Sequence, residues 1–212
     1  MSRVRVRRIT LCALLAASLG HPANATTINF DDQGITGPST FGGPEDTRTI
    51  STVDGNVTFS GGTFLTNTTN LPADQTTVYG TVEDPQYSNP LTVTFQNPVT
   101  NFFLDVLNGN TTTVDYTVAD NAGHSSTFTL PPNLSSGQTT IGFAATGTII
   151  TIFGAPDSNG FFDFFIDNVN FNAPLPPSLT GVPLPASLPL FATGLGALGL
   201  LGWRRKKKSI AA

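Results

Sequence analysis

Cysteine and positive charge are scarce in this chain of 212 residues, and their absence from its middle restricts what the protein can do. The only cysteine is Cys12, so a domain over residues 26–172 would contain neither a disulfide nor a thiolate ligand. Arg48 is the sole Lys or Arg between Thr26 and Thr180, against all fourteen Asp and Glu residues, a formal net charge of −13. Such a surface repels phosphate backbones, so we exclude nucleic acid as a partner. About 150 residues can still build a sufficient core without disulfides.

Histidine is almost as rare, which argues against most enzyme chemistries. His124 is the one histidine of residues 26–172 and lies in a turn, followed by two serines. Nucleophilic catalysis needs a base oriented next to its nucleophile, whereas neighbours on a strand point to opposite faces. A zinc site needs three or four His, Cys or carboxylate ligands, and no Gly-rich phosphate-binding motif occurs. We therefore predict a non-enzymatic protein. A secreted glycoside hydrolase stays open as an alternative, because two adjacent acidic pairs could supply its carboxylates, namely Glu45–Asp46 and Glu83–Asp84.

The first 25 residues have the parts of a secretory signal peptide. Four arginines precede an apolar segment at residues 9–19, and Ala23 and Ala25 are the small residues of a cleavage site. The apolar segment is about half as long as the ~20 residues that a membrane span needs. The pattern therefore predicts export through the inner membrane by the secretion machinery, with a mature chain that starts at Thr26.

Residues 26–172 form short alternating runs of apolar and polar residues between turn signals, which is typical of β-strands. The fold class predicted is all-β, an antiparallel β-sandwich of the jelly-roll kind with a phenylalanine-rich core. The clearest hairpin is VDYTVADNAGHSSTFTL, two alternating runs around Asp120-Asn121-Ala122-Gly123. The expected strands are 27–31, 47–53, 57–59, 63–66, 76–82, 91–95, 102–107, 112–119, 125–130, 139–144, 149–153 and 162–171.

The first and last of these runs each place a carboxylate among apolar residues. Alternation predicts two shared faces: Ile28, Phe30 and Asp32 in the first run, and Phe165, Asp167, Val169 and Phe171 in the last. Burying an unpaired carboxylate is costly, whereas two or three carboxylates with backbone carbonyls could hold one structural Ca²⁺. The predicted ligands are Asp32 and Asp167, with Asp31 as a further one. Simpler arrangements stay open: Asp32 lies in a turn before Gly34, and Asp167 sits at a solvated rim or accepts backbone hydrogen bonds.

The two bounding stretches, INFDD and FFIDNVNF, resemble the end strands of carbohydrate-binding-module-like, galactose-binding-type jelly rolls. The resemblance implies the fold, and it implies a structural calcium ion near these strands, which supports Asp32 and Asp167 as ligands. It also implies an alternative function for the domain, the binding of a specific glycan.

The C-terminal segment combines a linker, an apolar stretch and a basic end. Residues 173–185 are Pro-rich and uncharged, as in a semi-rigid spacer. Residues 186–203 are eighteen uncharged residues, about 27 Å if helical, which predicts a single transmembrane helix. Residues 204–212 are then a basic cytoplasmic tail. The interfacial and basic residues are Trp203, Arg204, Arg205, Lys206, Lys207 and Lys208.

This order of elements resembles the PEP-CTERM sorting signal, whose C-terminal part is also called an ice-binding protein C-terminal domain. The motif here is Val182-Pro183-Leu184-Pro185, in place of Pro-Glu-Pro. The resemblance implies processing by an exosortase, a membrane-anchored precursor, and a mature form at the cell surface or outside the cell. We therefore predict a non-enzymatic surface or matrix protein associated with exopolysaccharide.

Overall fold

The computed structural model describes residues 25–67, 69, 71, 75–132 and 139–180. The predicted signal peptide up to residue 24, the sorting motif at 182–185, the membrane span at 186–203 and the basic tail at 204–212 lie outside these residues. Among the described residues, no helix is both long and apolar enough to cross a membrane.

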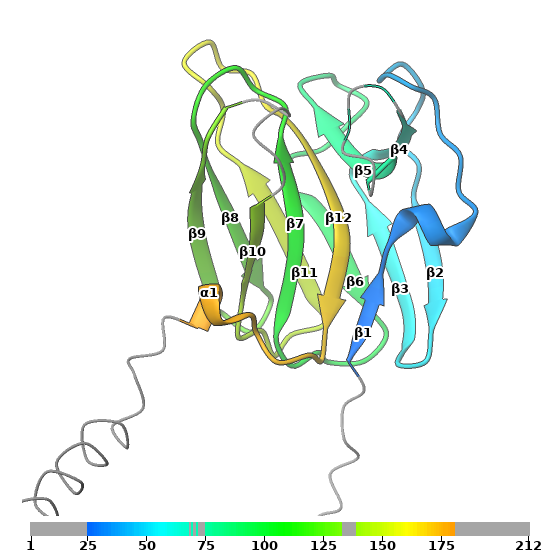
Figure 1. Ribbon diagram of the computed structural model, residues 1–212, viewed down its shortest axis with the longest axis vertical. Helices are drawn as coiled ribbons and strands as arrows, with labels where there is room; N and C mark the ends of the chain where they lie inside the picture. The colour runs from blue at the N-terminus through cyan, green and yellow to red at the C-terminus, as the bar shows by residue number, and fades with distance from the viewer. Residues whose placement is uncertain (1–24, 68, 70, 72–74, 133–138, 181–212) are drawn as a thin grey trace, which may run out of the picture.

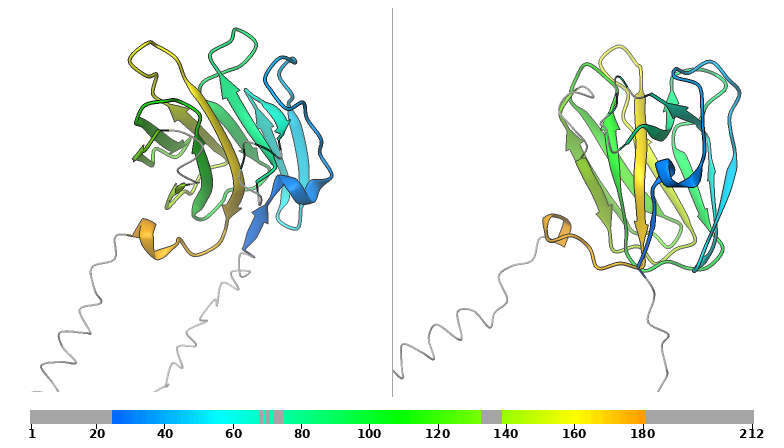
Figure 2. Two further views of the ribbon diagram at one scale, coloured as in Figure 1. Left: turned by 45° about the horizontal axis from the view of Figure 1, so that its top comes forward. Right: turned by 45° about the vertical axis from the view of Figure 1, so that its right-hand side comes forward.

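The described chain folds into two antiparallel sheets that face each other (Figures 1 and 2). In spatial order, sheet A contains β10 (Thr139–Phe143), β7 (Phe102–Asn108), β12 (Asp163–Phe171), β5 (Thr77–Val82) and β4 (Thr63–Thr66), with β1 (Thr26–Ile28) paired to β12. Sheet B contains β2 (Arg48–Thr52), β3 (Gly55–Ser60), β6 (Leu91–Phe95), β11 (Ile149–Gly154), β8 (Val114–Asp120) and β9 (Ser125–Leu130). Two short helices accompany them: a 3₁₀ helix, η1 (Phe30–Gln33), and α1 (Pro177–Thr180).

The chain passes repeatedly from one sheet to the other, as in a jelly roll: β6 lies in sheet B, β7 in sheet A, β8 in sheet B. The predicted antiparallel β-sandwich is confirmed, and each predicted strand has a counterpart among the described elements. Three strands, β4, β6 and β9, begin and end where alternation places them. The first and last strands, β1 and β12, lie side by side, with Thr26 opposite Phe171 (Figure 1).

Aromatic side chains dominate the core between the sheets, as predicted. The Phe30 ring packs edge-on against Phe59 and Phe64, with both pairs of ring centroids 5.1 Å apart. Each such pair contributes about 0.5–1.5 kcal/mol beyond the burial of its apolar surface. The buried hydroxyl of Tyr79 accepts a hydrogen bond from the Gly62 N–H and donates one to the Asp46 carbonyl. The core is therefore apolar, and the polar tip of Tyr79 has its hydrogen-bond partners within it.

The last strand, β12, changes faces at a β-bulge. Its register against β7 shifts between Asp167 and Asn170, and Asn168 adopts a left-handed conformation with φ of 48°. One extra residue in a strand reverses the face of everything that follows. Before the bulge, Phe165 faces away from the core, and after it Val169 faces into the core. The predicted common face of Phe165, Asp167, Val169 and Phe171 is therefore wrong.

The first strand is shorter than predicted. β1 ends at Ile28, and Asn29 caps η1 by accepting a hydrogen bond from the Asp31 N–H. Gly34 ends the helix with φ of 65°, a value that glycine adopts without strain. Because η1 replaces the extended chain, Asp32 does not share a strand face with Ile28 and is exposed instead. The alternative arrangement, Asp32 in a turn before Gly34, is the correct one.

Candidate functional site

A small pocket lies on the outer face of sheet A, the face turned away from the core. Its volume is about 160 Å³. The floor is apolar and the rim carries hydroxyl, amide and carboxyl groups. The described lining residues are Ser39, Thr40, Phe41, Leu65, Asn67, Leu71, Asp163 and Phe165.

The aromatic floor arises from strand alternation and one glycine. Phe165 points outward from β12 and belongs to a second apolar cluster, separate from the core, that Phe41 and Leu71 cover. The rings of Phe41 and Phe165 stack, with centroids 5.6 Å apart and planes 20° apart. Gly80 on β5 makes this possible, because a Cβ there would lie 2.6 Å from the Phe165 ring. The floor therefore depends on an aromatic pair whose two residues are 124 positions apart in the sequence.

Hydrogen bonds to neighbouring segments hold the stretch that carries Phe41. The Thr66 hydroxyl accepts a bond of 3.0 Å from the Gly37 N–H. The Asn67 amide donates to the Ser39 carbonyl at 3.2 Å. The Tyr87 hydroxyl donates to the Gly43 carbonyl at 2.6 Å, and its ring packs against Phe41 at 5.4 Å. These contacts position Phe41 over the sheet before any ligand arrives.

Asp163, the first residue of β12, brings a carboxyl group to the pocket. Its Oδ1 atom is buried and has no hydrogen-bond partner. Gly109 packs directly against the group, since a Cβ there would lie 2.5 Å from the Asp163 Cγ. Burial raises the pKa of Asp163 to about 6, because the ionised form loses its hydration there. Asp163 is thus the pocket's one ionisable side chain among the described lining residues.

A second polar cluster lies further along the same outer face of β12. Asp167 is fully buried, and directly opposite it on β7 is Asp105. The Asp167 Oδ1 accepts a hydrogen bond from the Phe30 N–H at 3.1 Å, whereas Oδ2 has no partner. Burial raises the pKa of Asp167 to about 7; backbone hydrogen bonds from Asn168 and Phe30 oppose this shift, and the charges of Asp31 and Asp105 add to it. The predicted alternative, Asp167 as an acceptor of backbone hydrogen bonds, is confirmed.

The other acids of this cluster are occupied by hydrogen bonds. Asp105 accepts one from the Thr140 hydroxyl at 2.7 Å and others from the side-chain amides of Gln75 and Asn168. Asp31 accepts a bond of 2.6 Å from the Thr77 N–H and one of 2.7 Å from the Thr76 hydroxyl. These bonds join η1, β5, β7, β10 and β12 on one side of sheet A.

The three residues predicted to bind calcium are only partly brought together. Asp31 lies close enough to Asp167 for its charge to act on it, whereas Asp32 is exposed. Over the described residues, no group of three His, Cys, Asp or Glu side chains is arranged to hold a metal ion. The buried oxygens without a partner here are Asp167 Oδ2 and Gln75 Oε1, fewer than the six to eight that Ca²⁺ takes. These side chains do not fit the ion as they lie, and a structural calcium stays a prediction.

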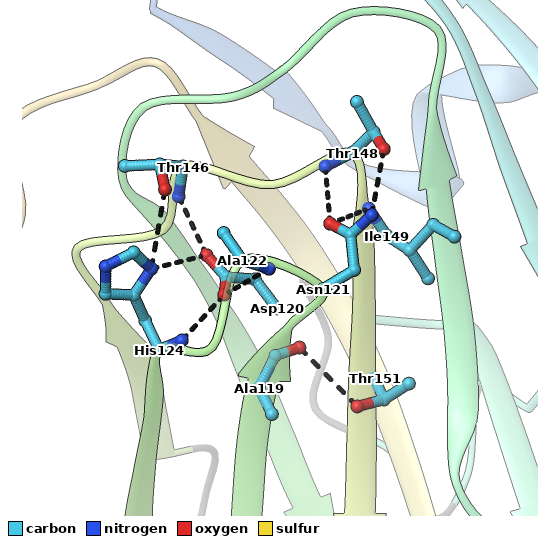
Figure 3. A network of polar contacts seen from close by, with 9 residues as sticks. All are labelled: Ala119, Asp120, Asn121, Ala122, His124, Thr146, Thr148, Ile149 and Thr151. Carbon is cyan, nitrogen blue, oxygen red and sulfur yellow. Dashed lines mark hydrogen bonds and ion pairs between the residues drawn. The ribbon is translucent and has the colours of Figure 1, made fainter.

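His124 lies in the predicted β8–β9 hairpin turn and serves the fold (Figure 3). Its imidazole Nδ1 is 3.0 Å from the buried carboxylate of Asp120, while half of the His124 side chain is exposed. Burial alone would raise the pKa of Asp120, but hydrogen bonds from the backbone N–H groups of Thr146 and His124 and the contact with the His124 ring hold it well below its usual range. Asn121 holds the same loop by accepting from the Thr148 N–H at 2.9 Å.

The two adjacent acidic pairs also have structural partners. Glu45 accepts hydrogen bonds of 2.9 Å from the Gly61 N–H and the Thr47 hydroxyl. Asp46 forms an ion pair of 2.8 Å with Arg48. Asp84 accepts a bond of 2.9 Å from the Gln86 N–H. These contacts close turns and give no sign of a paired acid and nucleophile.

In comparisons with known proteins, the chain is similar to solved structures but matches no family model and no curated protein. The solved structures it is similar to include variants of CBM29-2, a family 29 carbohydrate binding module. One has a TM-score of 0.36 and 14% identity over 73% of this chain and 99% of that chain. Another, complexed with mannohexaose, has a TM-score of 0.28 and 13% identity over 70% of this chain and 91% of that chain.

We expect the Asp167→Asn substitution to change how stability depends on pH. The folded-state pKa of Asp167 is raised, so its favourable contribution is present below about pH 4 and is lost as the pH rises through about 7. Asparagine cannot ionise, so the variant should be more stable than the wild type at pH 8, by about 2–4 kcal/mol, and similar at pH 4. Urea unfolding from pH 4 to pH 8 in the presence of a chelator measures this, because a bound cation would stabilise the ionised Asp167 of the wild type. The exposed Asp32→Asn variant is the matched control. If the free energy of unfolding changes with pH in Asp167→Asn as it does in the wild type, the raised pKa of Asp167 is contradicted.

The calcium prediction expects chelation to lower the melting temperature at pH 8. The ionised form of Asp167 is the one that binds a cation, and with a pKa of about 7 this form prevails at pH 8. Differential scanning calorimetry with and without EDTA tests this. An unchanged melting temperature at pH 8 would contradict a structural calcium ion. Hydrogen bonds would then be what stabilises the acidic side chains of this cluster.

Proposed function

We propose that the domain is a non-catalytic glycan-binding module of an exported protein, and that the pocket lined by Phe41 and Phe165 binds a sugar ring. The observation that carries the proposal is the stacked pair Phe41 and Phe165 at the floor of a pocket with a polar rim. Ligand sites combine an apolar floor with a few polar groups that fix orientation. A sugar ring needs both, because it has apolar C–H faces and hydroxyl groups around its edge.

The size of the pocket agrees with one ring. A dry cavity of about 150 Å³ admits benzene, and this pocket has about 160 Å³. A six-membered sugar ring would place its C–H face against Phe165 and Phe41. Its hydroxyl groups would then reach the side chains of Ser39, Thr40 and Asp163. The rest of an oligosaccharide would extend over the rim.

The arrangement of carboxylates favours binding over hydrolysis. Glycoside hydrolases place two carboxyl groups about 5–9.5 Å apart on either side of the scissile bond. Asp163 is the one carboxyl group among the described residues that line this pocket. A hydrolase would need a second one here, so the binding function is the better supported of the two.

We further propose that the protein reaches its ligand by export and sorting. The signal peptide pattern and the PEP-CTERM-like tail support a precursor that an exosortase processes and that ends at the cell surface or in the extracellular matrix. Exopolysaccharide is then the glycan within reach of the pocket. The net charge of −13 between Thr26 and Thr180 keeps such a domain soluble.

The Phe41→Ala substitution should weaken glycan binding at least tenfold. Truncation removes one ring of the floor, and buried aromatic residues carry much of the binding energy in such sites. A glycan array with the full-length protein identifies a ligand, and titration calorimetry then gives the dissociation constants of both forms. Phe153→Ala is the matched control, because this phenylalanine is exposed on the outer face of sheet B. Equal affinity in the wild type and Phe41→Ala would exclude the pocket as the binding site.

Processing of the tail predicts a measurable loss of mass. Intact-mass spectrometry of protein purified from its own cells should give a chain that starts at Thr26 and lacks residues 186–212. Deleting residues 204–208 should leave the longer form in the membrane fraction. A mature protein that retains residues 186–212 would contradict sorting by cleavage.

A further inference from the structure

The pocket contains a carboxyl group without a counter-charge. Asp163 Oδ1 is buried and unpartnered, and the hydrogen bonds given for this residue use its main-chain oxygen, which accepts from Gly109 and Asn110. Arg48, the sole Lys or Arg between Thr26 and Thr180, is already paired with Asp46. A buried charge that its own protein leaves unpaired is costly. Asp163 as a whole is half-buried and lines the pocket, so a ligand that brings a positive charge to the accessible part of its carboxylate would lower this cost.

The surroundings of Asp163 add no competing positive charge. β5 places Val82 opposite it, followed by the exposed Glu83, and β8 contributes Tyr116. Burial and the nearby charge of Asp163 both raise the pKa of Tyr116, so its hydroxyl stays neutral. The lining residues from the segment over the pocket, Ser39, Thr40 and Phe41, carry no charge. The field at the pocket is therefore negative whenever Asp163 is ionised.

The aromatic floor favours the same kind of ligand. The faces of phenylalanine rings carry partial negative charge and attract cations within about 6 Å of the ring centroid. Here two stacked rings, Phe41 and Phe165, line the pocket together with Asp163. A ring-sized ligand with a protonated amine would place its C–H face on the floor and its ammonium against the carboxylate. A neutral sugar would contact the phenylalanine rings but would form no ion pair with the Asp163 carboxylate.

We propose that the pocket selects a sugar ring that carries a free, protonated amino group, so that the ligand class is a glycan with de-N-acetylated amino sugars. This inference rests on the proposed function and narrows it from glycans in general to cationic ones. Asp163 is the residue that confers the selectivity, and Phe41 and Phe165 supply affinity that neutral rings share.

Matched oligosaccharides test the selectivity with the full-length protein. The probes are hexamers of β-1,4-linked glucosamine, of N-acetylglucosamine and of glucose, titrated calorimetrically at pH 7 and physiological salt. The glucosamine hexamer should bind at least tenfold more tightly than either neutral hexamer. Asp163→Asn should bring the ratio of the dissociation constants close to one. The exposed Asp115→Asn variant on β8 removes one acidic charge away from the pocket, and it should keep the ratio of the wild type.

The pH dependence gives a second measurement that needs no variant. The pKa of Asp163 is about 6 before a ligand binds, so its protonation should reduce the preference for a hexamer of N,N,N-trimethylated glucosamine, whose charge does not change with pH, over the glucose hexamer as the pH falls from 7 to 5. This measurement decides the question if Asp163→Asn fails to fold, which its melting curve would reveal.

The outcomes separate this inference from the proposed function. If the neutral hexamers bind as tightly as the glucosamine hexamer, the selectivity is overturned while glycan binding stands. If Asp163→Asn keeps the full preference, diffuse attraction by the acidic surface accounts for it, and the role of Asp163 is overturned. If no glycan on the array and none of the hexamers binds, both proposals fail.

Discussion

The bulge at Asn168 in β12 is the constraint on which the rest of the structure depends. β12 lies between β7 and β5 in sheet A, so the facing of its side chains determines what both surfaces of that sheet contain. Before the bulge, Asp163, Phe165 and Asp167 alternate on the outer face, and after it Val169 and Phe171 enter the core. An outer face that carries a phenylalanine ring would expose apolar surface to water unless other segments covered it. The covering segments that carry Phe41 and η1 follow from this requirement.

Scarcity of cations explains why the buried acids behave so differently. With Arg48 already committed to Asp46, the other carboxylates depend on hydrogen-bond donors. Asp120 has several backbone N–H donors and a histidine, and its pKa is lowered. Asp167 has fewer donors and two acidic neighbours, and its pKa is raised. Asp163 has no donor to its buried Oδ1 and, unlike the fully buried Asp167, is partly exposed and lines a pocket, which makes it the carboxyl group most open to an external partner. The number of donors around each acid thus separates structural carboxylates from the one that we assign to a ligand.

The alternation of apolar and polar residues was enough to predict the strands, but not which side chains of each strand face the core. Alternation between turn signals located the twelve strands, because the period of a strand is a property of the chain itself. The same rule failed in β12, since nothing in FFIDNVNF marks Asn168 as the residue that the sheet leaves unpaired. It also missed Asp163, although the spacing of Asp163, Phe165 and Asp167 at every second residue is visible in DFFID. Phe41, Gln75 and Asp105 gave no such signal, because the chain brings them to β12 only through long-range pairing.

The sequence by itself determined the fold class, the acidic character of the domain and the phenylalanine core. It determined these because composition, charge and two-residue periodicity act locally and need no knowledge of neighbours. The tertiary structure decided which carboxylates are buried, which of them find donors, and where an aromatic pair forms a pocket. Those outcomes depend on the register between strands and on one bulge, and a shift of a single residue exchanges the two faces of a strand. Asp32, a predicted ligand, lies exposed because η1 replaces the extended chain, while Asp163 lies beside a stacked pair of phenylalanines.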